Sequence, residues 1–172
     1  RSLIQKSGAR FVDLAEIGSY EDGLFNLEVF GKADRVVYLA AYLYHYRRDG
    51  SSSVTSGYNP RLYDQWQTLY DRMEAIIQSN QLGSEYEAAL NNRIALGILG
   101  LGLNITVSTQ SMGKKVKDIH RIIRQERYRK AYKNLPLNYF PIHWKLFYGC
   151  ARHGFAFGVY VLLTVIQRII SR

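Results

Sequence analysis

Apolar residues in the second half of the chain recur at the spacing of an amphipathic helix, and this pattern limits the fold more than any other feature. Every third or fourth position is apolar in the series Leu62, Trp66, Leu69, Met73, Ile76 and Ile77. Asn59-Pro60 precedes the series, and such a pair is typical of a helix start. The run 94–107 is apolar on all sides, as in a helix buried against its neighbours. Residues 57–172 are therefore predicted to form a mainly α-helical extension.

Two patterns inside this apolar run resemble functional motifs but indicate no function. Gly97, Gly100 and Gly102 follow no strand, so they favour close helix packing over a phosphate-binding loop. Asn104-Ile-Thr106 matches a glycosylation sequon, but its apolar surroundings indicate a chance match.

Two more helical segments are predicted towards the C-terminus. Segment 114–133 is amphipathic, because Val116, Ile119 and Ile123 lie on one stripe. A last helix is predicted from Trp144 to Ser171. Its longest uncharged run, 154–167, has 14 residues, whereas a helix that spans a bilayer needs about 17–25. A helix in the membrane interface, or one packed in a core, fits this length better.

Residues 1–56 are predicted to mix helices with short strands. Apolar spacing predicts a helix over 21–32, which contains Leu24, Leu27 and Val29. The runs 35–39 and 42–47 are rich in β-branched and aromatic residues, so each is predicted to be a strand. A loop rich in glycine and serine follows. The expected fold class is therefore α/β for residues 1–56, with the helical extension after it.

Charge is distributed unevenly along the chain. The 172 residues include 23 Lys and Arg and 14 Asp and Glu, for a net charge of +9. Up to Pro60 the two signs cancel, and segment 114–133 alone holds 9 basic and 2 acidic residues. This asymmetry indicates an anionic partner, either nucleic acid or a membrane surface. The single cysteine, Cys150, and four scattered histidines indicate no metal site.

Two segments could carry chemistry. Glu21 and Asp22 open a predicted helix, where free backbone N–H groups favour negative charge. Such a carboxylate can accept a proton from a substrate hydroxyl, although acidic residues in a first helical turn are also ordinary. The second segment combines arginines, which suit phosphate oxygens, with a serine-rich loop. Its candidate residues are His45, Arg47, Arg48, Ser51, Ser52 and Ser53.

The order and spacing of these segments resemble a known family. Arg1-Ser-Leu-Ile4, Arg10-Phe11, Tyr20-Glu-Asp-Gly-Leu-Phe-Asn-Leu-Glu28 and the stretch 35–53 are similar to the C-terminal part of the catalytic domain of family 2 glycosyltransferases. These are GT-A-type enzymes of bacterial surface-polysaccharide synthesis. The resemblance covers residues 1–56 and is looser over the helical extension, which gives a division into a catalytic part, 1–56, and an extension, 57–172.

The resemblance implies roles for the candidate residues. Asp22 falls where the family places the general base of an inverting transfer, and Glu21 would orient that base or contact the acceptor. His45, Arg47, Arg48 and Ser51 to Ser53 fall on a segment that can fold over the nucleotide diphosphate or the acceptor. The implied substrates are a nucleotide-sugar donor and a glycan or lipid-linked acceptor.

The chain also departs from the family pattern. No Asp-x-Asp motif occurs in it, so the ligands of the divalent cation (Mg or Mn) expected for the full-length enzyme are absent. The chain begins with Arg1 rather than Met. We therefore expect a fragment that is inactive when isolated.

The sequence of the basic extension is compatible with several kinds of binding partner. An enzyme that is peripheral at the cytoplasmic face of the membrane would use segments 114–133 and 144–171 to contact anionic lipid. Alternatively, the extension is a non-catalytic basic module that binds a membrane, a partner protein or nucleic acid, or it serves only for packing or oligomerisation. Nucleic acid is disfavoured, because no recognition-helix motif or RNA-binding aromatic signature is present.

Overall fold

The computed structural model describes residues 1–44 and 57–170, and every regular element among them is helical. The elements are α1 (Ser2–Ser7), α2 (Leu14–Ile17), α3 (Glu21–Phe30), α4 (Leu62–Ser79), α5 (Ser84–Thr106), α6 (Met112–Arg124), α7 (Glu126–Asn134), the 3-10 turn η1 (Leu137–Tyr139), α8 (Ile142–His153) and α9 (Ala156–Ile170). The helical character predicted for the C-terminal part is confirmed over its described residues.

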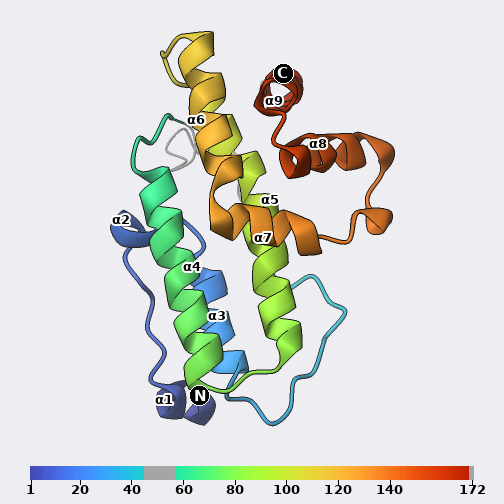
Figure 1. The fold of residues 1–172 in the computed structure, drawn as a ribbon. Helices are drawn as coiled ribbons and strands as arrows, with labels where there is room; N and C mark the ends of the chain where they lie inside the picture. Colours follow the sequence, from blue (N-terminus) through green and yellow to red (C-terminus); the bar gives the residue numbers. More distant parts are fainter. Residues whose placement is uncertain (45–56, 171–172) are drawn as a thin grey trace.

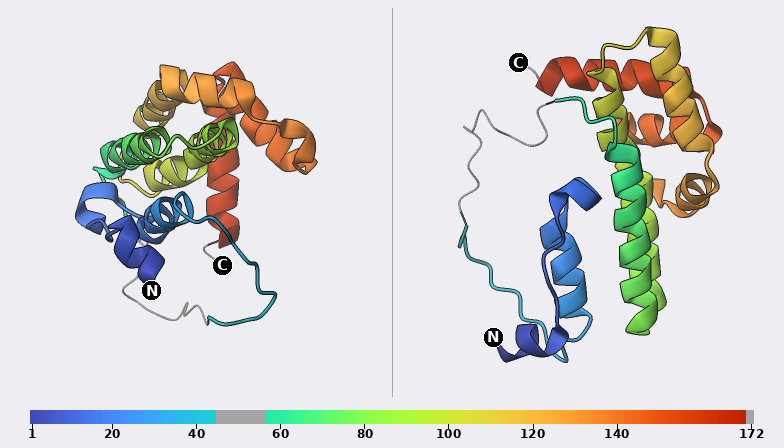
Figure 2. Two further views of the ribbon diagram at one scale, coloured as in Figure 1. Left: turned by 90° about the horizontal axis from the view of Figure 1, so that it is seen from below. Right: turned by 90° about the vertical axis from the view of Figure 1, so that its left-hand side faces the viewer.

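An antiparallel pair of long helices, α4 and α5, organises the bundle (Figure 1). Helices α2 and α3 pack against α4, while α6, α7 and α9 pack against α5. The right-hand view of Figure 2 shows α1 and the α8–α9 pair towards opposite ends of the molecule. The N-terminal segment is therefore attached to the bundle through α4.

The core lies where α4, α5 and the C-terminal helices meet. Its largest fully buried side chains are Leu69, Tyr70, Ile98, Leu101, Ile119, Ile123, Tyr128, Tyr132, Phe147, Val159 and Leu163, together with Ile17 of α2. A Cβ added at Gly97 would collide with the Tyr70 hydroxyl, and one added at Gly102 would collide with Leu163. The predicted role of these glycines in close helix packing is confirmed.

The expected α/β fold class is wrong, because residues 1–44 and 57–170 contain no strand. Residues 35–44 are irregular and exposed, with Tyr38 89% and Leu43 78% accessible. The backbone hydrogen bond within this segment joins Ala41 N–H to the Leu39 carbonyl, which is a local turn contact. β-Branched and aromatic residues favour a strand only when a neighbouring strand pairs with it, and this segment has no such neighbour among the described residues.

The predicted single helix from Trp144 to Ser171 is divided in two. Gly154 ends α8 with a left-handed backbone, φ 74°. Phe155 N–H then donates to the Cys150 carbonyl over 2.8 Å, and Gly154 N–H donates to the Ala151 carbonyl. This is the hydrogen-bonding pattern by which glycine ends helices, and it turns the chain into α9.

Candidate functional site

The segment that leads into α3 is fixed to α4 by polar contacts. The Gln65 side chain donates to the Ala15 carbonyl over 3.0 Å, and Trp66 Nε1 donates to Ser19 Oγ over 3.1 Å. Arg72 forms an ion pair with Glu16. These three contacts all come from α4, so the start of α3 has a defined position on the bundle.

Tyr20 connects the start of α3 to α5. Its backbone is left-handed, with φ 73°, which is uncommon for a residue with a Cβ. Its ring lies over Gly23, where a Cβ would collide with it. From α5, the Arg93 guanidinium carbon lies 3.8 Å from the centroid of the same ring, and it is 5.9 Å from the centroid of the Trp66 ring. Arg93 is thereby held by two aromatic rings.

The two candidate carboxylates lie in the first turn of α3, as the sequence predicts. Asp22 is exposed and Glu21 is half-buried. Asp22 Oδ1 accepts the Gly23 N–H over 2.6 Å, which leaves Oδ2 with no partner among the described residues. Their catalytic roles stay predictions. The other candidates, His45, Arg47, Arg48, Ser51, Ser52 and Ser53, lie outside the described residues.

A hollow of about 360 Å³ lies between α3, α4 and α5, and neither Glu21 nor Asp22 is among its described lining residues. It is lined by Tyr20, Gly23, Asn26, Leu27, Phe30, Met73, Ile77, Tyr86, Ala89, Leu90 and Arg93. Most of the wall is apolar, and Arg93 is the single charged group among these lining residues. Arg93 Nε is buried without a hydrogen-bond partner in the described structure. The hollow therefore suits a molecule with an apolar body and an anionic or hydrogen-bond-accepting group.

Sequence reasoning missed Arg93, although a signal for it was present. Arg93 is the sole charged residue between Glu87 and Lys114, in an otherwise apolar or neutral stretch. A charged side chain is rarely placed in a buried helix without a partner. The partners here, Tyr20 and Trp66, are far away in sequence, so the pattern could indicate a special residue but not its site.

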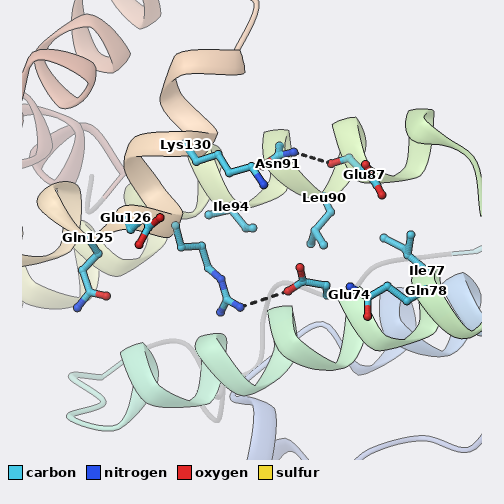
Figure 3. Close-up of a pocket in the computed structure, with 11 residues that line it drawn as sticks. Glu74, Ile77, Gln78, Glu87, Leu90, Asn91, Ile94, Gln125, Glu126 and Lys130 are labelled. Carbon is cyan, nitrogen blue, oxygen red and sulfur yellow. Dashed lines mark hydrogen bonds and ion pairs between the residues drawn. The ribbon is translucent and has the colours of Figure 1, made fainter.

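A second hollow, of about 490 Å³, lies between α4, α5 and the start of α7 and is shown in Figure 3. Its wall is mainly polar: Glu74 pairs with Arg127, and the Asn91 side chain donates to the Glu87 carbonyl. Lys130 extends from α7 towards α5 in the same view. None of the residues predicted from the sequence as site residues lines this hollow among the described part of the chain.

The basic segment 114–133 is partly neutralised inside the molecule. Asp118 pairs with Lys114 at 3.0 Å and with Arg121 at 3.5 Å. Arg127 pairs with Asp71 and Glu74 of α4. The remaining cations of this segment therefore carry its surface charge.

The last helix presents an exposed apolar stripe. Phe157, Val161, Val165 and Ile169 recur every four residues of α9, and each is between 42% and 68% exposed. Ile142 and Leu146 are exposed on α8 at the same spacing. Helix α5 is the one described helix that is long and apolar enough to span a bilayer, but it packs against four other helices here, as a core helix does.

The described residues offer no metal centre: no three His, Cys, Asp or Glu side chains within 1–44 and 57–170 are placed to share an ion.

Comparison with known proteins gives one relevant similarity. No family model and no solved structure matches the chain. Over 96 residues the chain is 31% identical to "Putative glycosyltransferase EpsH" of Bacillus subtilis (strain 168). The matched region is 56% of this chain but 28% of the Bacillus protein. This weak similarity supports a relation to a glycosyltransferase and gives no detail on donor, acceptor or mechanism.

Proposed function

We propose that this chain is the C-terminal part of a family 2, GT-A-type glycosyltransferase of bacterial surface-polysaccharide synthesis. The observation that carries the glycosyltransferase part of the proposal is the similarity to the Bacillus protein over 96 residues. Family 2 and the GT-A type rest on the resemblance of residues 1–56 to that family. The chain matches little more than a quarter of that protein, so a nucleotide-binding half with strands and cation ligands would lie outside residues 1–172.

In this proposal Asp22 is the general base. Its free Oδ2 takes the proton of an acceptor hydroxyl while the hydroxyl oxygen bonds to the anomeric carbon of the donor sugar. The bond from that carbon to the phosphate oxygen breaks on the opposite face, and the nucleoside diphosphate leaves with the electron pair. The anomeric configuration is inverted. Glu21, half-buried in the same helical turn, orients the acceptor or the base.

The hollow between α3, α4 and α5 is the proposed acceptor site. Tyr20 and Gly23, which flank the two carboxylates in sequence, form part of its wall. Its apolar lining would hold the lipid portion of a lipid-linked acceptor, and Arg93 would contact an anionic or hydroxyl group of that acceptor.

The test is Asp22→Asn in the full-length enzyme that contains this chain. We expect transfer, followed as release of nucleoside diphosphate from a panel of nucleotide sugars, to fall by about 10²–10⁴-fold, the usual contribution of a general base. Donor binding should change little, because Asp22 acts on the acceptor. Asp34→Asn is the matched control, since Asp34 is an exposed acidic residue outside the site. Turnover retained in Asp22→Asn would place the base elsewhere.

The isolated 172-residue chain is expected to be inactive, because no Asp-x-Asp is available to hold a donor and its cation. Incubation of the chain alone with the same nucleotide sugars and Mg²⁺ or Mn²⁺ checks this expectation. Measurable transfer would refute the fragment interpretation while leaving the role of Asp22 open to the first experiment.

We further propose that the enzyme is peripheral at the cytoplasmic face of the cell membrane. The support is the exposed stripe of α9, which would enter the interface, and the positive excess of residues 61–172, which would attract anionic lipid. Val165→Glu with Ile169→Glu should prevent flotation with vesicles that contain phosphatidylglycerol. Val37→Glu with Leu39→Glu changes two exposed apolar residues elsewhere and should leave flotation intact. Equal behaviour of the two variants would argue against membrane insertion through α9.

A further inference from the structure

A groove of about 740 Å³ lies between the end of α6, helix α7 and helix α8, and its lining is dominated by cations. The lining residues are Arg124, Glu126, Arg129, Lys130, Lys133 and Arg152. All of these side chains except that of Glu126 are positively charged. The groove is separate from the proposed acceptor hollow, with which it shares no described residue.

The cations of α7 lie on one helix face for a structural reason. Positions 126, 129, 130 and 133 are three and four residues apart, which places them on the same side of a helix. Tyr128, Ala131 and Tyr132 occupy the other side and are buried in the core. Burial of the tyrosine face therefore fixes the direction in which the basic face points.

Arg152, on the wall formed by α8, is held in place by hydrogen bonds. Arg152 Nε donates to the Tyr132 carbonyl over 2.9 Å, and its Nη2 donates to the Leu135 carbonyl over 2.6 Å, which anchors Arg152 at the end of α7. The Arg124 guanidinium lies against Gly154, where a Cβ would come within 2.6 Å of Nε. Side chains that are already ordered lose less entropy when a ligand binds.

Glu126 is the one acidic residue among the described lining residues, so the groove keeps an excess of positive charge. Arg124, Arg129, Lys130 and Lys133 form no ion pair with them, in contrast to Lys114, Arg121 and Arg127 of the same basic segment. Neighbouring cations repel one another, and an anion that binds between them removes this cost. Guanidinium groups pair with phosphate oxygens through two parallel hydrogen bonds.

We propose that this groove is a binding site for a phosphate or diphosphate group, which is either free in solution or the headgroup of an anionic lipid. The site does not depend on the proposed sugar transfer, because none of its residues belongs to the Asp22 site. A lipid headgroup as the ligand would deepen the proposed membrane location, which uses the same positive excess, but the site does not depend on insertion of the α9 stripe, since none of the stripe residues lines the groove.

The test uses the 172-residue chain and the double variant Arg129→Glu with Lys133→Glu. Both side chains are exposed and form no hydrogen bond or ion pair with the described residues, so the fold should survive. Lys6→Glu with Arg10→Glu gives the same change in net charge at the distant N-terminal end. Circular dichroism confirms folding. Calorimetric titration with inorganic pyrophosphate tests the free source, and co-sedimentation with phosphatidylglycerol or phosphatidylcholine vesicles tests the lipid source.

We expect the groove variant to bind at least about tenfold more weakly than the parent chain, with the N-terminal variant unchanged. If the groove variant loses affinity for pyrophosphate, the ligand is a free phosphate or diphosphate. If it loses affinity for phosphatidylglycerol vesicles alone, the ligand is a lipid headgroup. The proposal is wrong if neither probe binds the parent chain or if the two variants lose affinity equally. It is also wrong if a single-stranded RNA oligonucleotide binds through these residues while pyrophosphate and vesicles do not.

Discussion

The Arg93 guanidinium lies 3.8 Å from the centre of the Tyr20 ring and so joins the start of α3 to the middle of α5. The two residues are 73 positions apart in the chain. Arg93 also faces Trp66 of α4, and its Nε is buried without a hydrogen-bond partner among the described residues. Tyr20 and Arg93 both line the hollow between α3, α4 and α5, and their contact ties the N-terminal segment to the helical extension.

The stack itself should contribute measurably to stability. Tyr20→Ala removes the ring above Arg93, and we expect the free energy of unfolding to fall by about 1 kcal/mol, within the range of a cation–π contact. Urea denaturation followed by circular dichroism measures the change. Tyr20→Phe keeps the ring and should cost much less. Tyr38→Ala removes a tyrosine that is 89% exposed and serves as the control. If all three variants lose a similar free energy of unfolding, the contact between Tyr20 and Arg93 does not contribute to stability.

Gly97 should tolerate no side chain while Tyr70 is present. A Cβ at Gly97 would collide with the Tyr70 hydroxyl, so Gly97→Ala should lower the free energy of unfolding by about 1–3 kcal/mol. Combining it with Tyr70→Phe removes the obstructing oxygen and should recover much of the loss. A Cβ added at Gly149 of α8 would meet no other atom within 4 Å, so Gly149→Ala should be stabilising by about 0.5–1 kcal/mol. Thermal melts of the parent chain and the three variants check both signs.

Stability should fall at alkaline pH because of buried tyrosines. Burial raises the pKa of Tyr70 to about 12, and it also raises the pKa of Tyr128 and of Tyr132. An unfolded tyrosine ionises near pH 10. Above that pH the unfolded chain releases protons that the folded chain retains, so the stability present below pH 10 is lost as pH rises towards 12.

The rise in the pKa of Tyr70 from 10.0 to about 12 corresponds to a loss of about 3 kcal/mol across this interval. Urea midpoints at pH 8, 10 and 11 measure the decline. Tyr70→Phe should make it shallower, without loss of stability at pH 8, because the Tyr70 hydroxyl has no hydrogen-bond partner in the described structure. A midpoint that is constant up to pH 11 would show that these tyrosines are accessible to water.

The hydrogen bonds between Asn59 and Asn104 should contribute to the stability of the fold. They join the segment that precedes α4 to the last turns of α5. Asn104 Oδ1 accepts the Asn59 N–H and Asn104 Nδ2 donates to the Asn59 carbonyl, each over 2.8 Å. Asn104→Ala leaves both Asn59 backbone groups without these partners, and we expect a loss of about 1–3 kcal/mol in the free energy of unfolding. Asn92→Ala, in the same helix, is the control. Chemical denaturation distinguishes the two variants, and equal stabilities would mean that water replaces the Asn104 amide.

Local sequence patterns were sufficient for much of the helical part. The series from Leu62 to Ile77 predicts α4, and the residues around Leu24 and Leu27 predict α3, because helical spacing alone places these side chains on one face. The candidate carboxylates Glu21 and Asp22 lie at a helix start as expected. The strand predicted for 35–39 failed, as did the described part of the strand predicted for 42–47, since their residues have a strand preference that only a pairing neighbour can realise.

The sequence by itself determined where amphipathic helices form and where the positive charge accumulates, because both depend on residues close together in the chain. The tertiary structure alone decided that Arg93 stacks on Tyr20 and that Arg152 faces the basic side of α7. It also decided which cations are neutralised, since Asp71 and Glu74 come from another helix than Arg127. These contacts join residues far apart in sequence, and packing of the helices around α5, rather than any local preference, brings them together.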